Sequence, residues 1–186
     1  LCTGSTALVP PLPGTGLDGV HVFRDPEDCE RILNAAGQAK HAAVIGGGLL
    51  GLEAAYALAR LGIPTTVVHL MDRLMERQLD GPAAALLAPA IEALGVDVRL
   101  EHQTDGILGD SDGRVCGLQF RGGERLACDL VVIAVGIRPR LELARAAGLK
   151  LDRGIIVDDR LVSSDERVLA VGECAEHRGT VYGLVA

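Results

Sequence analysis

Short apolar runs recur along the chain and are separated by longer segments rich in Ala and Leu. Residues 42–45 form one such run, residues 65–70 form a segment rich in β-branched residues that is typical of a strand, and residues 96–100 alternate between apolar and polar positions. A short, fully apolar run is typical of a strand that is buried on both faces. The intervening segments, 49–61 and 82–94, have the length and composition of helices. This β-α-β-α-β order predicts a parallel sheet with right-handed crossovers.

After residue 100 the pattern predicts a different arrangement. Three short strands within residues 107–128 are separated by Gly-containing turns, which favours a small antiparallel meander. The apolar run 130–135 then suits a return to the parallel sheet. The remaining predicted elements are a strand end and extended loop over 1–19, a helix over 25–36, a helix over 141–147, and strands at 154–157 and 168–171.

The composition excludes several classes of protein. Apolar residues make up 48% of the 186 residues and charged residues 23%, so disorder is not the main state. Aromatic residues are only 2%, which disfavours base-stacking surfaces, and the net charge of −7 disfavours nucleic acid or an anionic membrane as partner. We find no bilayer-length apolar run and no export signal, and the five cysteines form no CxxC pair. We therefore expect a cytoplasmic location, reduced thiols and no metal site.

A glycine fingerprint of the form G-x-G-x-x-G directly follows the first predicted strand. It consists of Gly46, Gly47, Gly48, Leu49, Leu50 and Gly51. Gly46 permits a tight turn, Gly48 lets a pyrophosphate approach the backbone, and Gly51 lets the helix pack closely on the strand. The unpaired N–H groups of the helix N-terminus would face the phosphates. The sequence therefore predicts a Rossmann-like unit that binds a dinucleotide.

The acidic residue expected about 20 positions later, on the ribose 2′-hydroxyl, is missing. His69 takes its place at the end of the second predicted strand, and Arg73 and Arg77 follow. A histidine with nearby arginines could accept either NADH or NADPH, and the arginines could equally form a solvated face. The nucleotide preference stays open at this point.

Glu53 lies in the first turn of the helix that follows the glycines. A carboxylate there interacts favourably with the helix N-terminus. The same side chain could also point toward a nicotinamide ring. Both interpretations stay open on the residues alone.

Three motifs flank the fingerprint in a characteristic order. The first is Cys2-Thr3-Gly4-Ser5, the second contains Gly136 in a G-x-x-P turn over 134–139, and the third, over 163–173, ends in Gly172-Glu173. Together they resemble the pyridine nucleotide–disulfide oxidoreductase superfamily over essentially the whole chain. The resemblance implies that Thr3, Gly4, Gly172 and Glu173 border FAD, that Gly136 ends the NAD(P)H domain, and that Glu53 lies beside the nicotinamide–flavin contact. The superfamily usually has Asp where this chain has Glu173.

A closer resemblance is to one branch of that superfamily, the large subunits of NAD(P)H-dependent nitrite reductases. It is carried by residues 69–80, 170–179 and 182–186. It implies that NAD(P)H gives hydride to FAD, and that electrons then pass through iron–sulfur centres to a sirohaem, where nitrite becomes ammonia. Those metal centres would lie in remaining domains of the same chain, and a small subunit would be a further partner. A homodimer is left open.

The resemblance divides the chain into three segments. Residues 1–36 would end the first FAD-domain segment, 37–148 would form the NAD(P)H-binding domain, and 149–186 would start the second FAD-domain segment. Two alternatives stay open. The chain could belong to another flavin reductase of the ferredoxin reductase, rubredoxin reductase or NADH oxidase type, or it could act in isolation as a nucleotide-binding module without turnover. Because it lacks the first FAD glycine motif, we expect the isolated fragment not to retain FAD.

Overall fold

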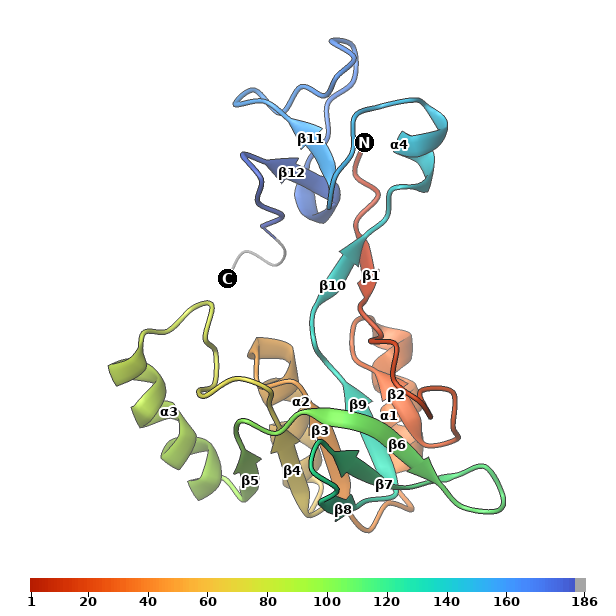
Figure 1. Ribbon diagram of the computed structural model, residues 1–186, viewed down its shortest axis with the longest axis vertical. Coiled ribbons are helices and arrows are strands. Elements are labelled where there is room, and N and C mark those ends of the chain that lie inside the picture. The colour runs from red at the N-terminus through yellow and green to blue at the C-terminus, as the bar shows by residue number, and fades with distance from the viewer. Residues whose placement is uncertain (183–186) are drawn as a thin grey trace. The chain divides into compact units, whose positions relative to one another are not determined.

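The structure is a computed structural model that describes residues 1–182, so the resemblance noted for residues 183–186 lies outside the described part. The chain forms two compact units. The larger unit comprises residues 8–136, and the smaller unit combines residues 1–7 with the chain from residue 137 onward. Figure 1 labels the elements of both units.

The larger unit is built on a five-stranded sheet in the order β2-β9-β3-β4-β5, with every neighbouring pair parallel. Its strands are β2 (Val20–Val22), β3 (Ala42–Ile45), β4 (Thr65–Val68), β5 (Val96–Arg99) and β9 (Leu130–Ile133). Its helices are α1 (Pro26–Ala36), α2 (Leu49–Arg60) and α3 (Gly81–Ala93). The predicted parallel sheet, its helices and the return of the late apolar run to the sheet are confirmed.

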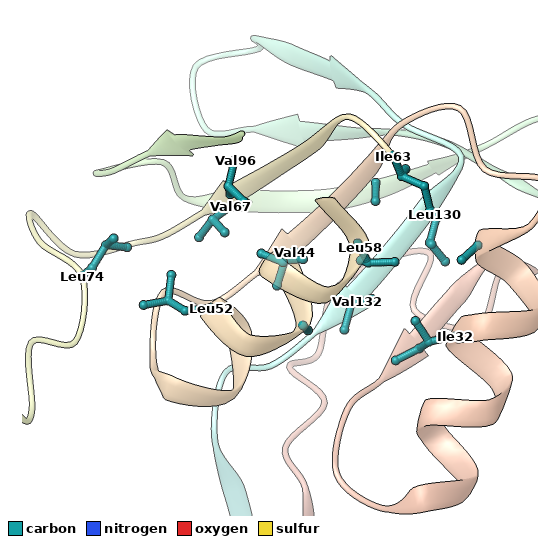
Figure 2. Close-up of a cluster of buried hydrophobic side chains, with 14 residues drawn as sticks. Ile32, Val44, Leu52, Leu58, Ile63, Val67, Leu74, Val96, Leu130 and Val132 are labelled. Atoms are coloured by element: carbon teal, nitrogen blue, oxygen red, sulfur yellow. The ribbon is translucent and has the colours of Figure 1, made fainter. Parts of the chain in front are cut away.

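Side chains of β3 enter two separate hydrophobic clusters. Ala42 and Val44 pack into a cluster with α1 and α2, whereas Ala43 and Ile45 pack into a second cluster on the other face. Figure 2 shows Val44 of β3 together with Leu52 and Leu58 of α2 in the first cluster. Successive strand side chains point to opposite faces, so a strand covered on both faces must be apolar throughout.

The second face of the sheet is covered by an antiparallel meander. It consists of β6 (Thr104–Gly109), β7 (Val115–Phe120) and β8 (Arg125–Ala127), paired in that order. Leu118 and Phe120 are buried in the second cluster with Val131 and Ile133 of β9. The larger unit is therefore layered as helices, parallel sheet and meander, which confirms the predicted α/β fold with a Rossmann-like sheet and a small antiparallel meander.

The smaller unit contains two short strand pairs and has a hydrophobic core of its own. Its elements are β1 (Ser5–Ala7), β10 (Ile137–Pro139), α4 (Glu142–Ala146), β11 (Ile155–Val157), the 3₁₀ turn Gly172–Cys174 and β12 (Ala175–His177). β1 pairs antiparallel with β10, and β11 pairs parallel with β12. Leu141, Ala144 and Ile155 are among the residues buried in its core.

Two local predictions were wrong, and one strand was not predicted. The expected strand at 168–171 is limited to a bridge between Val162 and Leu169, and the strand partner of β11 is β12. Residues 137–139, expected as a turn, form β10 because they pair with β1. The edge strand β2 lies just after the segment expected to be a loop and was not predicted, and it forms through pairing with the distant β9.

The bounds of the two units also differ from the three segments expected from the sequence. Residues 8–36 belong to the larger unit, and residues 137–148 belong to the smaller one. Among residues 1–182 there is no helix with the length and hydropathy needed to cross a membrane.

Candidate functional site

The glycine fingerprint forms a turn between β3 and α2 that only glycine fits at two positions. Gly46 has a φ of 121°, and a Cβ there would lie 2.3 Å from the carbonyl oxygen of Ala134. A Cβ at Gly51 would lie 1.9 Å from the carbonyl oxygen of Gly46. These contacts hold the first turn of α2 directly against the end of β3.

Gly48 lies at the same turn but has a different environment. It is the N-cap of α2, it provides no side-chain cap, and a Cβ there would have no atom within 4 Å. The first N–H groups of α2 have no intrahelical partner, and the helix dipole adds partial positive charge. The turn therefore leaves open space in front of a helix N-terminus, the arrangement that receives a pyrophosphate.

His69 follows β4 and is buried, with 9% of its surface exposed. Its Nδ1 accepts a hydrogen bond from the Gly47 N–H at 3.0 Å, and its Nε2 lies 3.0 Å from Oε2 of Glu76. The hydrogen-bond network assigns the neutral ring with its proton on Nε2, because Nδ1 is already an acceptor. His69 therefore fixes the glycine turn, and both its ring nitrogens are engaged.

The two arginines expected near the ribose are placed differently from one another. Arg73 is partly exposed, and its Nη1 lies 3.1 Å from Oδ1 of Asp72. Arg77 is exposed on the turn that follows. A cavity of about 700 Å³ opens beside Arg73, and its lining includes Asp72, Glu101 and Glu124. The structure thus gives Arg73 a carboxylate partner and places it at a cavity of mixed charge.

Glu53 and Gly136 are exposed positions of the larger unit. The Glu53 side chain projects from α2, and it has no hydrogen bond or ion pair to any residue among 1–182. Gly136 has a φ of 126° and accepts a hydrogen bond from the Leu8 N–H at 2.9 Å. Gly136 therefore makes a backbone turn that an L side chain rarely adopts, directly after β9 and the residues that line Gly46.

The flanking motifs of the first and last segments meet within the smaller unit. Thr3 donates its hydroxyl to the Arg140 carbonyl at 2.8 Å, and Gly4 accepts from the Arg140 N–H at 2.9 Å. Ser5 donates its hydroxyl to Oε2 of Glu173 at 2.9 Å. Residues about 168 positions apart thus form one cluster, and Ser5 is a member that we did not select from the sequence.

Two glycines of this cluster face open space. Gly4 and Gly172 have φ values of 65° and 78°, and a Cβ at either would have no atom within 4 Å. The Glu173 carboxylate, partly buried and held by a hydroxyl, lies directly after Gly172. A hydrogen-bonding carboxylate beside exposed backbone fits a polyhydroxyl chain. This is the chemistry expected of residues that border the ribityl part of FAD.

Neither unit offers a metal site within the described residues. Residues 1–182 contain no group of three or more His, Cys, Asp or Glu side chains arranged to hold a metal ion. All five cysteines are free thiols, and Cys128 and Cys174 are buried. Burial raises the pKa of the Cys128 thiol to about 12, with a smaller contribution from the nearby Asp129 carboxylate.

A family model described as pyridine nucleotide-disulphide oxidoreductase matches residues 1–184. The chain belongs to this family. A nitrite reductase [NAD(P)H] of Bacillus subtilis is 51% identical over 186 residues, covering all of this chain and 23% of that protein. An assimilatory nitrate reductase electron transfer subunit of the same organism is 46% identical, covering all of this chain and 24% of that protein. The chain thus spans about a quarter of the length of these relatives.

A solved structure confirms the fold independently. A ferredoxin reductase from Rhodopseudomonas palustris superposes with a TM-score of 0.91 at 33% identity, covering 95% of this chain and 44% of that one. The family assignment and this likeness agree with the resemblance that the flanking motifs predict.

Proposed function

We propose that this chain is the part of a nitrite reductase that binds NAD(P)H and reduces flavin. One observation carries the nucleotide-binding role. The α2 N-terminus is held against β3 by the contact between Gly51 and Gly46, while Gly48 faces open space. Close packing at one glycine and space at the other are what a pyrophosphate at a helix N-terminus requires.

The residues of the larger unit would divide the work of binding. The N–H groups that begin α2 would hold the pyrophosphate of NAD(P)H, and Gly136 would shape the edge of the site. Glu53, exposed and without a partner among residues 1–182, is available to orient the carboxamide end of the nucleotide. Hydride transfer depends on the orientation of two rings, so we assign these residues positioning roles and no proton relay.

The cluster in the smaller unit would hold part of FAD. Thr3, Gly4, Gly172 and Glu173 would border its ribityl chain, with Ser5 keeping the Glu173 carboxylate in place. FAD, when bound, accepts a hydride and releases electrons one at a time. Sirohaem and iron–sulfur centres would lie in other parts of the full protein, since residues 1–182 hold no candidate metal cluster.

The proposal that nitrite is the final electron acceptor is supported by the names of the relatives. The proteins at 51% and 46% identity are named for nitrite reductase and for assimilatory nitrate reductase. A second candidate is electron transfer to a small iron–sulfur protein. It is favoured by a rhodocoxin reductase of Rhodococcus erythropolis at 36% identity and by the ferredoxin reductase structure. A cytoplasmic location, a small subunit and a homodimer stay predictions.

Rapid mixing of the full-length protein with NADH or NADPH, without oxygen, tests this function. We expect the flavin absorbance to bleach at a rate that saturates with nucleotide concentration. Nitrite should then restore the absorbance, whereas an oxidised ferredoxin-type protein should restore it if the second candidate is correct. A flavin that neither nucleotide reduces would contradict both candidates.

A further inference from the structure

The site lacks the carboxylate that normally contacts the adenosine ribose, and the structure shows that His69 does not replace it directly. His69 is buried, its Nδ1 is occupied by the Gly47 N–H, and its Nε2 is occupied by Glu76. A ring with both nitrogens engaged has no further hydrogen-bonding atom to offer a ribose hydroxyl. His69 therefore occupies the sequence position of the ribose-binding carboxylate without being able to perform its role.

Glu76 brings a carboxylate back to the end of β4. The chain reverses at Met75, which has a φ of 54°, and the Met75 N–H donates to the Gly47 carbonyl at 3.0 Å. Leu74 is fully buried and lies against Gly47. These contacts tie the segment 74–76 to the glycine turn. Glu76 consequently has a fixed place next to the turn although it lies seven residues beyond His69.

The Glu76 side chain is both held and accessible. Its Oε2 accepts from Nε2 of His69 at 3.0 Å, and 24% of the side chain is exposed. The pair presents a carboxylate, held by His69 and reachable from solvent, beside the glycine turn.

We propose that Glu76, oriented by His69, is the specificity-determining carboxylate of the nucleotide site and makes it prefer NADH to NADPH. The proposal rests on the proposed nucleotide-binding function. The Glu76 carboxylate can accept a hydrogen bond from a ribose 2′-hydroxyl, and the same carboxylate repels a 2′-phosphate. Arg73, the obvious candidate for holding a 2′-phosphate, is already paired with Asp72.

The test is calorimetric binding of NAD⁺ and NADP⁺ to the full-length protein and to its Glu76→Gln variant. The wild type should bind NAD⁺ more tightly. Gln keeps a hydrogen bond to His69 and removes the charge, so the ratio of the NADP⁺ to the NAD⁺ dissociation constant should fall about tenfold. Glu92→Gln removes an exposed carboxylate from α3 of the same unit and should leave the ratio unchanged.

Arg73→Ala gives a second measurement that does not depend on how Glu76→Gln folds. If Glu76 sets the preference, the ratio in Arg73→Ala should stay within about twofold of the wild type. A ratio that is unaltered in folded Glu76→Gln, or NADP⁺ binding that weakens selectively in Arg73→Ala, would overturn the proposal while leaving nucleotide binding intact. A wild type that binds neither nucleotide would instead refute the proposed function itself.

Discussion

The α-carbon of Gly51 packs so closely on the carbonyl oxygen of Gly46 that a methyl group at residue 51 would lie 1.9 Å from that oxygen. Both partners are backbone, so neither can move aside as a flexible side chain could. The contact fixes how α2 approaches β3, and thereby where the open face of Gly48 lies. One turn therefore combines the close packing of Gly46 and Gly51 with the open space at Gly48 that the proposed pyrophosphate site needs.

Gly51→Ala should destabilise the larger unit. In an unstrained helix, Gly→Ala is stabilising by up to about 1 kcal/mol, but here the added Cβ meets backbone and should cost about 3 kcal/mol. Urea unfolding monitored by circular dichroism measures the difference. Gly81→Ala, which adds a Cβ in open space at the start of α3, is the matched control and should be neutral or stabilising. Equal stabilities for the two variants would contradict the account.

Replacing His69 should loosen the glycine turn. His69→Phe removes the acceptor of a buried N–H group, and an unsatisfied buried donor costs about 1–3 kcal/mol. His69→Asn provides a side-chain oxygen for the same N–H and should recover part of that loss. Free energies of unfolding in urea decide the comparison. Variants that are equally destabilised would argue against the Gly47 hydrogen bond as the cause.

The buried thiol of Cys128 should make the larger unit less stable at high pH. Its pKa is raised to about 12 in the folded chain, against an ordinary value of 9.0. Ionisation therefore favours the unfolded chain, and this contribution to stability is present below pH 9 and is lost as the pH rises toward 12. Cys128→Ala should flatten this part of the stability profile. A profile that is identical in the variant would contradict the assignment.

Thiol labelling at neutral pH gives an independent measure of the same burial. The exposed Cys2 and Cys116 should react first, and Cys128 should react only on unfolding. Mass spectrometry of labelled peptides identifies the order. Rapid labelling of Cys128 in the folded protein would show that its thiol is accessible, and the raised pKa would then lose its basis.

Glu173 should contribute to flavin retention in the full-length protein. Glu173→Ala removes the carboxylate that Ser5 holds, and we expect FAD affinity to fall about tenfold, as for the loss of one hydrogen bond to a charged group. Glu173→Gln keeps a hydrogen-bond acceptor, so the FAD affinity of this variant should fall less. Glu166→Ala, at an exposed position of the same unit, serves as control. Flavin fluorescence after dilution measures release, and equal affinity in Glu173→Ala would remove Glu173 from the site.

The sequence predicted those features that depend on local pattern. The run 42–45 is apolar because both its faces are buried. The glycine spacing is informative because Gly46 and Gly51 leave no room for a Cβ, whereas Gly48 faces open space. The prediction at 168–171 was wrong because β-branched residues alone do not provide a strand partner. The Val171 N–H donates to the Leu1 carbonyl at the far end of the chain.

The positions of His69 and Glu76 mark the limit of prediction from spacing. The spacing from the glycines predicted His69 at the position of the ribose carboxylate, but its side chain points toward Gly47 and accepts the Gly47 N–H. The chain passes through the left-handed residue Met75 and brings Glu76 against His69, and nothing in the residue type of Met signals that conformation. Ser5 was missed for a similar reason, since its partner Glu173 lies 168 residues away.

Nucleotide binding by the Gly48→Val variant tests the central claim most directly. A side chain at residue 48 has room in the folded protein, so it should leave the unfolding midpoint close to that of the wild type while filling the space assigned to the pyrophosphate. Calorimetry with NADH should show affinity at least about a hundredfold weaker than in the wild type, and Gly81→Val should bind normally. Unchanged NADH affinity in folded Gly48→Val would mean that the pyrophosphate does not bind at the N-terminus of α2.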